Sequence, residues 1–328
     1  MRIVTRPDFD GIVCAVIILE AHQQEIPIVW IEPGQVQNGS TDIRTGDIMA
    51  NLPFDERCSV WFDHHVSNSM KFEQYLLKDS PNIKGLEREE GGLKQRDRSE
   101  IRKKIEGAFR IAPSAAGVAY QYYREHGKLF RNFDDLIRET DIIDSAMLSM
   151  DQVTYPEHYP FILLSMTVKN RDNSDHLYWN RLVSLLRHKS IDDILADKEV
   201  RQRCDRVIDE NMAYADILRK YTQIYGNISV TDFRNLDRAP SGNRFLTYSL
   251  FPESVASVKI RYDDQDRNIV LVSVGRSIFN DGFNVNIGKM LAKYGGGGHA
   301  GAGGCSISVS DADKTIREII GIMKTNQV

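Results

Sequence analysis

Short runs of β-branched residues alternate with a long apolar segment at the start of the chain. The segments RIVT (2–5) and PIVWIE (27–32) have the composition of strands, and residues 11–23 between them have the length of a buried helix. A strand, a helix and a second strand in this order form a βαβ unit with parallel strands. Further strand patterns follow at DIMA (47–50) and CSVWF (58–62). We therefore predict a parallel sheet in an N-terminal α/β domain.

A long helical pattern separates this region from a second, smaller one. Apolar residues recur at helical spacing over roughly residues 190–225, Ser190 and Asp193 resemble a capping box, and Gly226 ends the pattern. We interpret this segment as a connector between domains. The predicted bounds are 1–186 for the first domain, 187–226 for the helical connector and 227–328 for the second domain.

The last third of the chain again combines strands with helices. Strand patterns occur at ISVTDF, FLTYSLF, SVKIRY and NIVLVSVG, followed by a helix, a glycine cluster, the strand CSISVS and a last helix that begins at Asp311. This order predicts a smaller α/β domain with a mixed sheet. In the first domain, by contrast, 14 of the 23 residues in 84–106 are charged, which predicts a solvated loop or a surface helix.

The composition excludes several classes of protein. The chain of 328 residues carries 42 basic and 46 acidic side chains, a net charge of -4, so an anionic ligand must be held locally. It has no basic, aromatic-rich stripe, and we expect no long nucleic acid as substrate. The apolar run 13–21 is too short for a membrane span. The four scattered cysteines form no CxxC pair and are typical of a cytoplasmic protein.

Acidic and imidazole side chains follow two of the predicted strands. The strand at 2–5 leads into Asp8 and Asp10, and the strand at 58–62 leads into Asp63, His64 and His65. In a parallel sheet, ligands bind beyond the carboxyl ends of the strands. Mixed carboxylate and imidazole ligands suit Mn²⁺, Fe²⁺ or Zn²⁺ better than Ca²⁺ or Mg²⁺.

Each motif alone also has a simpler interpretation. An acid pair before a helix is often a cap that interacts with the helix dipole, and paired histidines at a strand end are often a hydrogen-bonded surface feature. The two motifs together, at one edge of one predicted sheet, favour a metal site.

The glycine cluster KYGGGGHAGAGG, residues 293–304, is a third candidate site. Four consecutive glycines disfavour both helix and strand, so the backbone there must approach something closely or adopt positive φ. Amides freed in this way form an anion-binding nest, to which His299 can add a donor. Arg276 ends an apolar strand upstream, where its guanidinium could grip a phosphate. The alternatives are a flexible hinge for the glycines and an exposed ion pair for Arg276.

The combination of motifs resembles the DHH phosphoesterase superfamily with its DHH-associated C-terminal domain. The resemblance rests on DFDG near the N-terminus, DHH at 63–65, ETDIIDSA at 139–146 and GGGGHAGAGG near the C-terminus, and it spans nearly the whole chain. It implies an N-terminal parallel-sheet DHH domain, a smaller C-terminal domain and a Mn²⁺-dependent phosphohydrolase activity. Within the superfamily, the chain looks most like exopolyphosphatase-related proteins.

The resemblance also implies roles for individual residues. Asp8 corresponds to a ligand of a first metal, whereas Asp10, His64 and Asp141 correspond to ligands of a second, with Asp144 as an alternative to Asp141. Asp63 and His65 would orient the ligands or face the substrate. The phosphate of the substrate would be held by Gly296, Gly297, Gly298, His299 and Arg276.

Two positions depart from the family pattern. The family has a histidine two or four residues before the first aspartate, where this chain has Arg6 and Val4. It also has a metal-bridging aspartate at the end of the strand before DHH. Asn51 occupies the carboxyl end of that predicted strand and is the favoured equivalent, whereas Asp47 lies at its beginning and remains the alternative.

We therefore expect a phosphohydrolase with one or two Mn²⁺ ions, acting on a small nucleotide, a short oligonucleotide or polyphosphate. The alternative is a binding protein that keeps the phosphate pocket but has a degenerate first metal site, in which the Arg6 cation pairs with Asp8 or with phosphate. We expect no membrane partner, and the surface of the 190–225 helix could serve a homodimer.

Overall fold

The computed structural model describes residues 1–78, 105–169 and 175–327. Most of the charged segment predicted as a loop or surface helix, residues 84–104, lies outside the described residues. None of the described helices is both long and apolar enough to cross a membrane.

The chain divides into two compact units, and the second interrupts the first in sequence. The first unit contains residues 1–147 and 160–201, and the second contains residues 148–159 and 202–328. One unit holds a five-stranded sheet and the other a six-stranded sheet, which confirms the predicted α/β fold with a parallel sheet and a second, mixed sheet.

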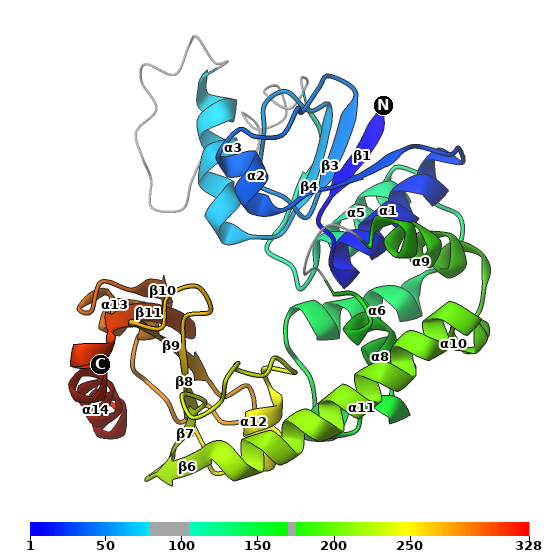
Figure 1. Ribbon diagram of the computed structural model, residues 1–328. Coiled ribbons are helices and arrows are strands. Elements are labelled where there is room, and N and C mark those ends of the chain that lie inside the picture. Colours follow the sequence, from blue (N-terminus) through cyan, green and yellow to red (C-terminus); the bar gives the residue numbers. More distant parts are fainter. Residues whose placement is uncertain (79–104, 170–174, 328) are drawn as a thin grey trace. The chain divides into compact units, whose positions relative to one another are not determined.

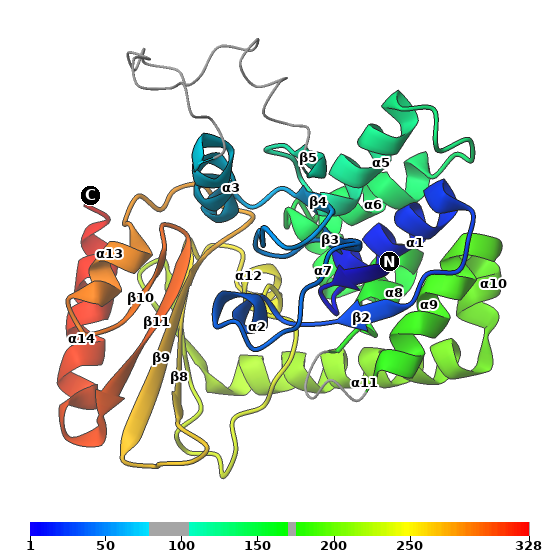
Figure 2. The same cartoon turned by 90° about the horizontal axis from the view of Figure 1, so that it is seen from above.

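The first unit is built on parallel strands in the order β2-β1-β3-β4-β5; β1, β3 and β4 are labelled in Figure 1, and β2 and β5 in Figure 2. The first four strands lie where the sequence predicts them, and β5 pairs along the outer side of β4. Their bounds are β1 (Arg2–Thr5), β2 (Ile28–Trp30), β3 (Asp47–Ala50), β4 (Val60–Asp63) and β5 (Glu106–Phe109).

Helices cover both faces of this sheet. Helix α1 (Phe9–His22) is buried from Phe9 to Leu19 and packs against α5 (Ala115–Glu125), α6 (Asp134–Asp144) and α9 (His176–His188). On the opposite face, Met49 and Trp61 pack with residues of α2 (Pro33–Gln37) and α3 (Val66–Lys78). The shorter helices α8 (Pro160–Met166) and α10 (Ile191–Ala196) complete the unit.

The second unit contains a mixed sheet in the order β10-β11-β9-β8-β7-β6, in which β7 and β8 are parallel and the other pairs are antiparallel (Figure 1). Helices α13 (Ile287–Ala292) and α14 (Val309–Thr325) pack on its apolar face. The strands are β6 (Thr222–Tyr225), β7 (Ile228–Asp232), β8 (Ala256–Tyr262), β9 (Ile269–Arg276), β10 (Gly297–His299) and β11 (Ala302–Ser308).

Two secondary-structure predictions are wrong in this region. The sequence predicts a strand at 245–251, but the segment contains helix α12 (Leu246–Leu250), because Leu246 joins an apolar cluster with Phe233 while the Tyr248 hydroxyl lies 2.8 Å from Ser257 Oγ. The helical pattern at 190–225 forms two helices and a strand. Helix α10 ends before Asp197, helix α11 (Lys198–Tyr221) follows, and residues 222–225 form β6.

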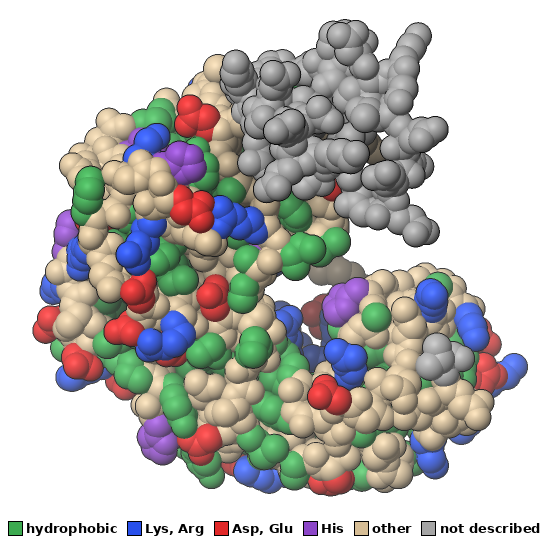
Figure 3. All heavy atoms as spheres, turned by 180° about the vertical axis from the view of Figure 1, so that it is seen from behind, with side chains coloured by type: hydrophobic (Ala, Val, Ile, Leu, Met, Phe, Trp, Pro, Cys, Tyr) green, Lys and Arg blue, Asp and Glu red, His purple; other side chains and the backbone are tan. Residues whose placement is uncertain are grey.

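The remaining helical segments of the second unit are α7 (Met150–Thr154) and a 3-10 turn (Pro156–His158), and α7 packs against α12. All four cysteines are buried and unpaired. Charged side chains of both signs are interspersed over the face of the molecule in Figure 3, as the small net charge leads one to expect.

Candidate metal centre

The turn after β1 places Asp8 and Asp10 at the start of α1. Asp8 is the N-cap residue of this helix, and its Oδ1 accepts a hydrogen bond from the Gly11 amide at 2.8 Å. A Cβ atom on Gly11 would lie 2.0 Å from the carbonyl oxygen of Arg6. Only glycine fits this position, which explains the DFDG sequence as a tight strand-to-helix turn.

Asp10 is buried and is held by the first turn of α5. Its carboxylate accepts hydrogen bonds from the amides of Ala115, at 3.0 Å, and Ala116, at 2.8 Å. Burial, with the negative charges of Asp144 and Asp8, raises the pKa of Asp10 well above its usual value. A bound cation would favour the ionised form of this carboxyl group.

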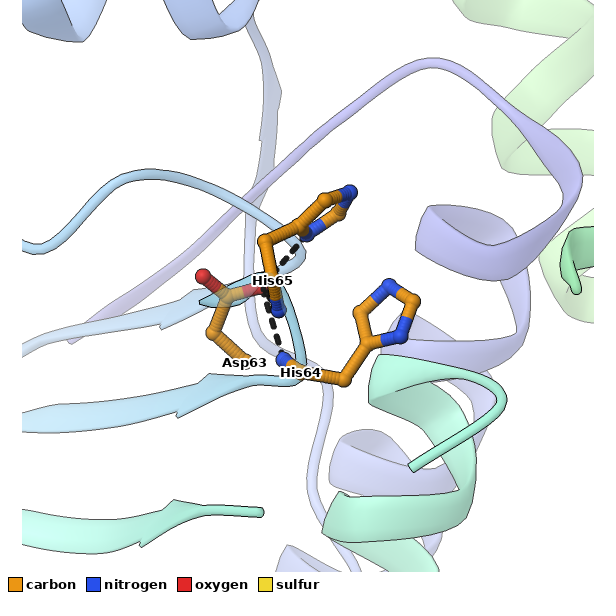
Figure 4. A group of neighbouring side chains, drawn as sticks. All are labelled: Asp63, His64 and His65. Carbon is orange, nitrogen blue, oxygen red and sulfur yellow. Dashed lines mark hydrogen bonds and ion pairs between the residues drawn. The ribbon is translucent and has the colours of Figure 1, made fainter. Parts of the chain in front are cut away.

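The DHH sequence begins at the last residue of β4, and its aspartate has a structural role. Asp63 is fully buried. Its Oδ1 accepts the His64 amide at 2.9 Å and pairs with His65 Nδ1 at 2.8 Å, while its Oδ2 accepts from Asn68 Nδ2 at 2.6 Å (Figure 4). The hydrogen bond to Asp63 is the main cause that raises the pKa of His65. Asp63 therefore fixes the turn and orients His65.

His64 has the geometry of a metal ligand. Its Nδ1 lies 2.9 Å from the carbonyl oxygen of Ala112, which can only accept, so Nδ1 is a donor and Nε2 is the nitrogen left for an ion or a second proton. Nε2 is buried and makes no hydrogen bond within the described residues, and it lies 3.2 Å from Asp144 Oδ2, an ion pair only when the ring is protonated. A buried imidazole nitrogen without a donor is costly unless a cation or a proton occupies its lone pair.

Three side chains come together around this nitrogen. Asp10, His64 and Asp144 each offer a ligand atom, and these atoms lie within 4.8 Å of one another. Two carboxylates and one imidazole form a donor set that suits a divalent transition ion. The buried Nε2 of His64, which makes no hydrogen bond within the described residues, is the observation that favours such an ion here.

The structure brings Asp144 rather than Asp141 into this group. Asp141, one helical turn earlier on α6, accepts a hydrogen bond from Ser114 Oγ at 2.5 Å, and burial raises its pKa. Ser114 is also the N-cap of α5, where its Oγ accepts from Gly117 N at 2.9 Å.

Asp141 lines a pocket of roughly 330 Å³ beside this group. Most of its lining surface is apolar. Its other lining residues are Pro113, Tyr120, Ile137, Ile142 and Met147, with the charged side chains Asp134 and Arg138.

Asn51 and Asp47 lie at opposite ends of β3. Asp47 is at the amino end, where both of its oxygens accept from the guanidinium of Arg2 at 2.9 and 2.7 Å, so the structure does not bring it to the group. Asn51 follows the carboxyl end with a φ of 55°, and its Nδ2 donates to Asp8 Oδ1 at 2.9 Å.

Arg6 lies beside Asp8. Its Nε is 3.2 Å from Asp8 Oδ2 and 3.7 Å from Glu32 Oε2, and about two fifths of its side chain is exposed.

Several residues of this site are not predicted from the sequence. Glu32 follows β2 as Asp63 ends β4, so the same strand-end argument could have found it. Asn68 and Ser114 have no comparable signal, because their roles depend on how α3 and α5 pack.

In the second unit, the glycine cluster forms an ordered edge strand. Gly298 has a φ of 146°, and a Cβ there would lie 2.2 Å from the carbonyl oxygen of Ala302, while a Cβ on Gly296 would lie 2.4 Å from that of Gly304. Gly297 has neither constraint, because a Cβ there would meet nothing within 4 Å. Packing within the unit thus explains two of these glycines and leaves Gly297 facing open space.

His299 and Arg276 lie on either side of the turn that follows β10. His299 is exposed, and its Nδ1 accepts from the Gly301 amide at 3.1 Å. The backbone amide of Arg276, at the end of β9, donates to Gly301 O at 2.9 Å, and the Arg276 side chain is exposed. The predicted phosphate-binding residues therefore gather at one corner of the second sheet.

No family model matches the chain, and no curated protein sequence matches it. Several solved structures do. The pGpG-specific phosphodiesterase PggH from Vibrio cholerae is 27% identical, with a TM-score of 0.81 over 99% of both chains. An exopolyphosphatase-related protein from Bacteroides fragilis is 12% identical, with a TM-score of 0.50 over 99% of this chain and 93% of the other. The exonuclease RecJ bound to manganese is 13% identical, with a TM-score of 0.50 over 98% and 89%.

These similarities extend over the whole chain, and the sequence carries the DFDG, DHH and GGGGH motifs in the order of the family. The chain therefore belongs to the DHH phosphoesterase superfamily. Within it, the similarity to the phosphodiesterase PggH combines the higher identity with the higher TM-score of the three.

Proposed function

We propose that the protein is a metal-dependent phosphohydrolase that cleaves a phosphoester in a small nucleotide or a short linear oligonucleotide. The observation that carries this proposal is the buried Nε2 of His64 beside Asp10 and Asp144, in a chain similar along its whole length to a phosphodiesterase. Manganese is the proposed ion, because it accepts mixed carboxylate and imidazole ligands and is present in the similar RecJ structure.

Asp10, His64 and Asp144 would hold the ion. When bound there, a divalent cation would supply Lewis acidity for activating water and polarising the phosphorus–oxygen bond. His65, whose Nδ1 is held by Asp63, would present its other nitrogen to the leaving oxygen and donate a proton. The raised pKa of His65 keeps more of this imidazole protonated near neutral pH.

Two further groups of residues would bind the substrate. Gly296, Gly297, Gly298, His299 and Arg276 would bind a phosphate through amides and charged donors. The apolar pocket beside Asp141 has room for a nucleobase, and this favours a nucleotide over inorganic polyphosphate. Because the similar PggH is a pGpG-specific phosphodiesterase, a 5′-phosphorylated linear dinucleotide is the first substrate to test.

The test is product release by the purified chain with Mn²⁺, measured by chromatography on pGpG, mononucleotides and polyphosphate. We expect mononucleotides from pGpG, loss of activity with a chelator, and at least a hundredfold loss of kcat in His64→Ala. His126→Ala, which removes an exposed imidazole of the same unit, is the matched control and should retain activity. Release of no product from any of these substrates would refute the proposal.

The binding-protein alternative rests on one specific observation, the ion pair between Arg6 and Asp8 at 3.2 Å. A guanidinium at this position could hold phosphate without hydrolysing it. A metal-free chain that binds pGpG with micromolar affinity and leaves it intact after Mn²⁺ addition would favour this second function.

A further inference from the structure

We infer that this centre takes one divalent cation per chain, and that the guanidinium of Arg6 provides the second positive charge and contacts a phosphoryl oxygen of the substrate. The inference rests on the proposed phosphohydrolase function. It concerns the region around Asp8, which borders the group formed by Asp10, His64 and Asp144.

The first observation is that Asp8 is already supplied with donors. Its Oδ1 accepts from Gly11 N at 2.8 Å and from Asn51 Nδ2 at 2.9 Å, and its Oδ2 lies 3.2 Å from Arg6 Nε. These donors and the Arg6 cation favour the carboxylate form of Asp8, as a metal ion would, although burial outweighs them and raises its pKa overall. Among the described residues, Asp8 is not part of a group of ligand atoms that could surround an ion.

The second observation is that Arg6 is held from two sides and is still accessible. Asp8 and Glu32 come from the ends of neighbouring strands, and both carboxylates lie within 4 Å of the same nitrogen, Nε. About two fifths of the side chain is exposed, so the outer guanidinium nitrogens can reach a ligand. A planar guanidinium fixed by carboxylates is well suited to phosphate. A divalent ion at Asp8 Oδ2 would be repelled by this cation.

The third observation is that Asn51, like Arg6, contacts the Asp8 carboxylate through a donor group. The amide of Asn51 can donate to Asp8, whereas an aspartate at this buried position would place a carboxylate about 2.9 Å from Asp8 Oδ1. Such a pair of carboxylates would need a further cation to neutralise it. Arg6 and Asn51 therefore form one arrangement, in which donors replace an ion around Asp8, and both must change before a second ion can bind.

The experiment counts ions in the full chain after removal of metal by a chelator. Calorimetric titration with Mn²⁺ should give one ion per chain for the wild type, and electron paramagnetic resonance should show an isolated Mn²⁺ signal without spin coupling. The double substitution Arg6→His with Asn51→Asp should bind two ions and show a coupled spectrum. Arg6→His alone and Asn51→Asp alone should each keep one ion.

A further variant tests the contact with substrate. Arg6→Gln should keep one Mn²⁺ with an affinity within about threefold of the wild type, yet lose about a hundredfold in kcat/KM, because a charge on the phosphoryl oxygen is no longer neutralised. Arg44→Gln, which removes an exposed guanidinium of the same unit, is the matched control and should change neither quantity.

The outcomes separate this inference from the proposed function. Two ions in the wild type, or one ion in the double variant with a native melting curve, would overturn the inference and leave the phosphohydrolase intact. An unchanged kcat/KM in Arg6→Gln would overturn the substrate contact. No ion in the wild type, or unchanged Mn²⁺ binding in His64→Ala, would overturn the proposed metal centre itself.

Discussion

Substitution of Asp63 by asparagine should reduce stability by more than its small change in size suggests. Asp63 is fully buried, and its two oxygens form hydrogen bonds with the His64 amide, His65 Nδ1 and Asn68 Nδ2 at 2.6–2.9 Å. In Asp63→Asn one oxygen becomes an NH₂ group. In one orientation it faces the donor of Asn68, and in the other it faces the donors of His64 and His65.

With the Asn68 amide in its present orientation, at least one buried donor is therefore left without an acceptor in either case. An unsatisfied buried donor costs about 1–3 kcal/mol, and hydrogen bonds to a charged acceptor contribute about 1.5–3 kcal/mol. We expect the free energy of unfolding to fall by about 2–4 kcal/mol. Urea denaturation monitored by circular dichroism measures this change, and a loss below about 1 kcal/mol would refute our description of Asp63 as the residue that fixes the turn.

The reciprocal exchange provides the control. Asp63→Asn combined with Asn68→Asp restores one acceptor for each donor across the 2.6 Å contact. The double variant should therefore be more stable than the sum of the two single effects, by about 1 kcal/mol or more. Additive losses would show that the Asp63–Asn68 hydrogen bond contributes little.

The same substitution should change the titration of His65. The hydrogen bond to Asp63 raises the folded pKa of His65 above its unfolded value, so the stability from this pair is fully present below the unfolded pKa. It is lost as the pH rises through the folded pKa. In Asp63→Asn the His65 pKa measured by NMR should fall, and the stability should depend less on pH in this window.

Three further predictions concern the candidate sites. His64→Ala should lower Mn²⁺ affinity at least tenfold, about 1.4 kcal/mol, with a native circular dichroism spectrum; unchanged affinity by calorimetry would exclude His64 as a ligand. Mn²⁺ affinity should still rise with pH above the range in which an ordinary carboxyl group titrates, because the raised pKa of Asp10 means that a proton must leave before an ion binds; a flat profile by calorimetry would count against Asp10. Gly297→Val should weaken pGpG binding with a melting temperature within a few degrees of the wild type, whereas Gly298→Val should lower the melting temperature itself; equal thermal losses would mean that Gly297 is only structural.

The position of the candidate metal site could be predicted from sequence because parallel strands deliver the residues after them to one edge. Asp8, Asp10 and His64 all follow strands whose patterns are clear. The resemblance favours Asp141 over Asp144, whereas the structure groups Asp144 with Asp10 and His64. The two aspartates lie one turn apart on α6, and the rotation of that helix depends on packing. The hydrogen bond from Ser114 to Asp141 is a tertiary contact between α5 and α6 that no local pattern encodes.

The same distinction explains the misassigned helix. Residues 245–251 are aromatic and β-branched enough to favour a strand, but Leu246 packs with Phe233 and Tyr248 reaches Ser257, and these contacts exist only once β7 and β8 have formed. The glycine cluster illustrates the opposite case. Its unusual composition indicates a close backbone approach, and the contacts that a Cβ would make at Gly296 and Gly298 give the physical reason.

The burial of every native thiol makes this chain a convenient background for site-specific labelling. Burial raises the pKa of Cys58 to about 12 and that of Cys204 to about 11, so few thiolates are available at neutral pH. A cysteine introduced at exposed Phe130 in the first unit and another at exposed Met212 in the second would react with maleimide dyes far faster than the native thiols. Energy transfer between the two dyes would then report the separation of the two units directly, with and without Mn²⁺ and a nucleotide, in an otherwise unmodified protein.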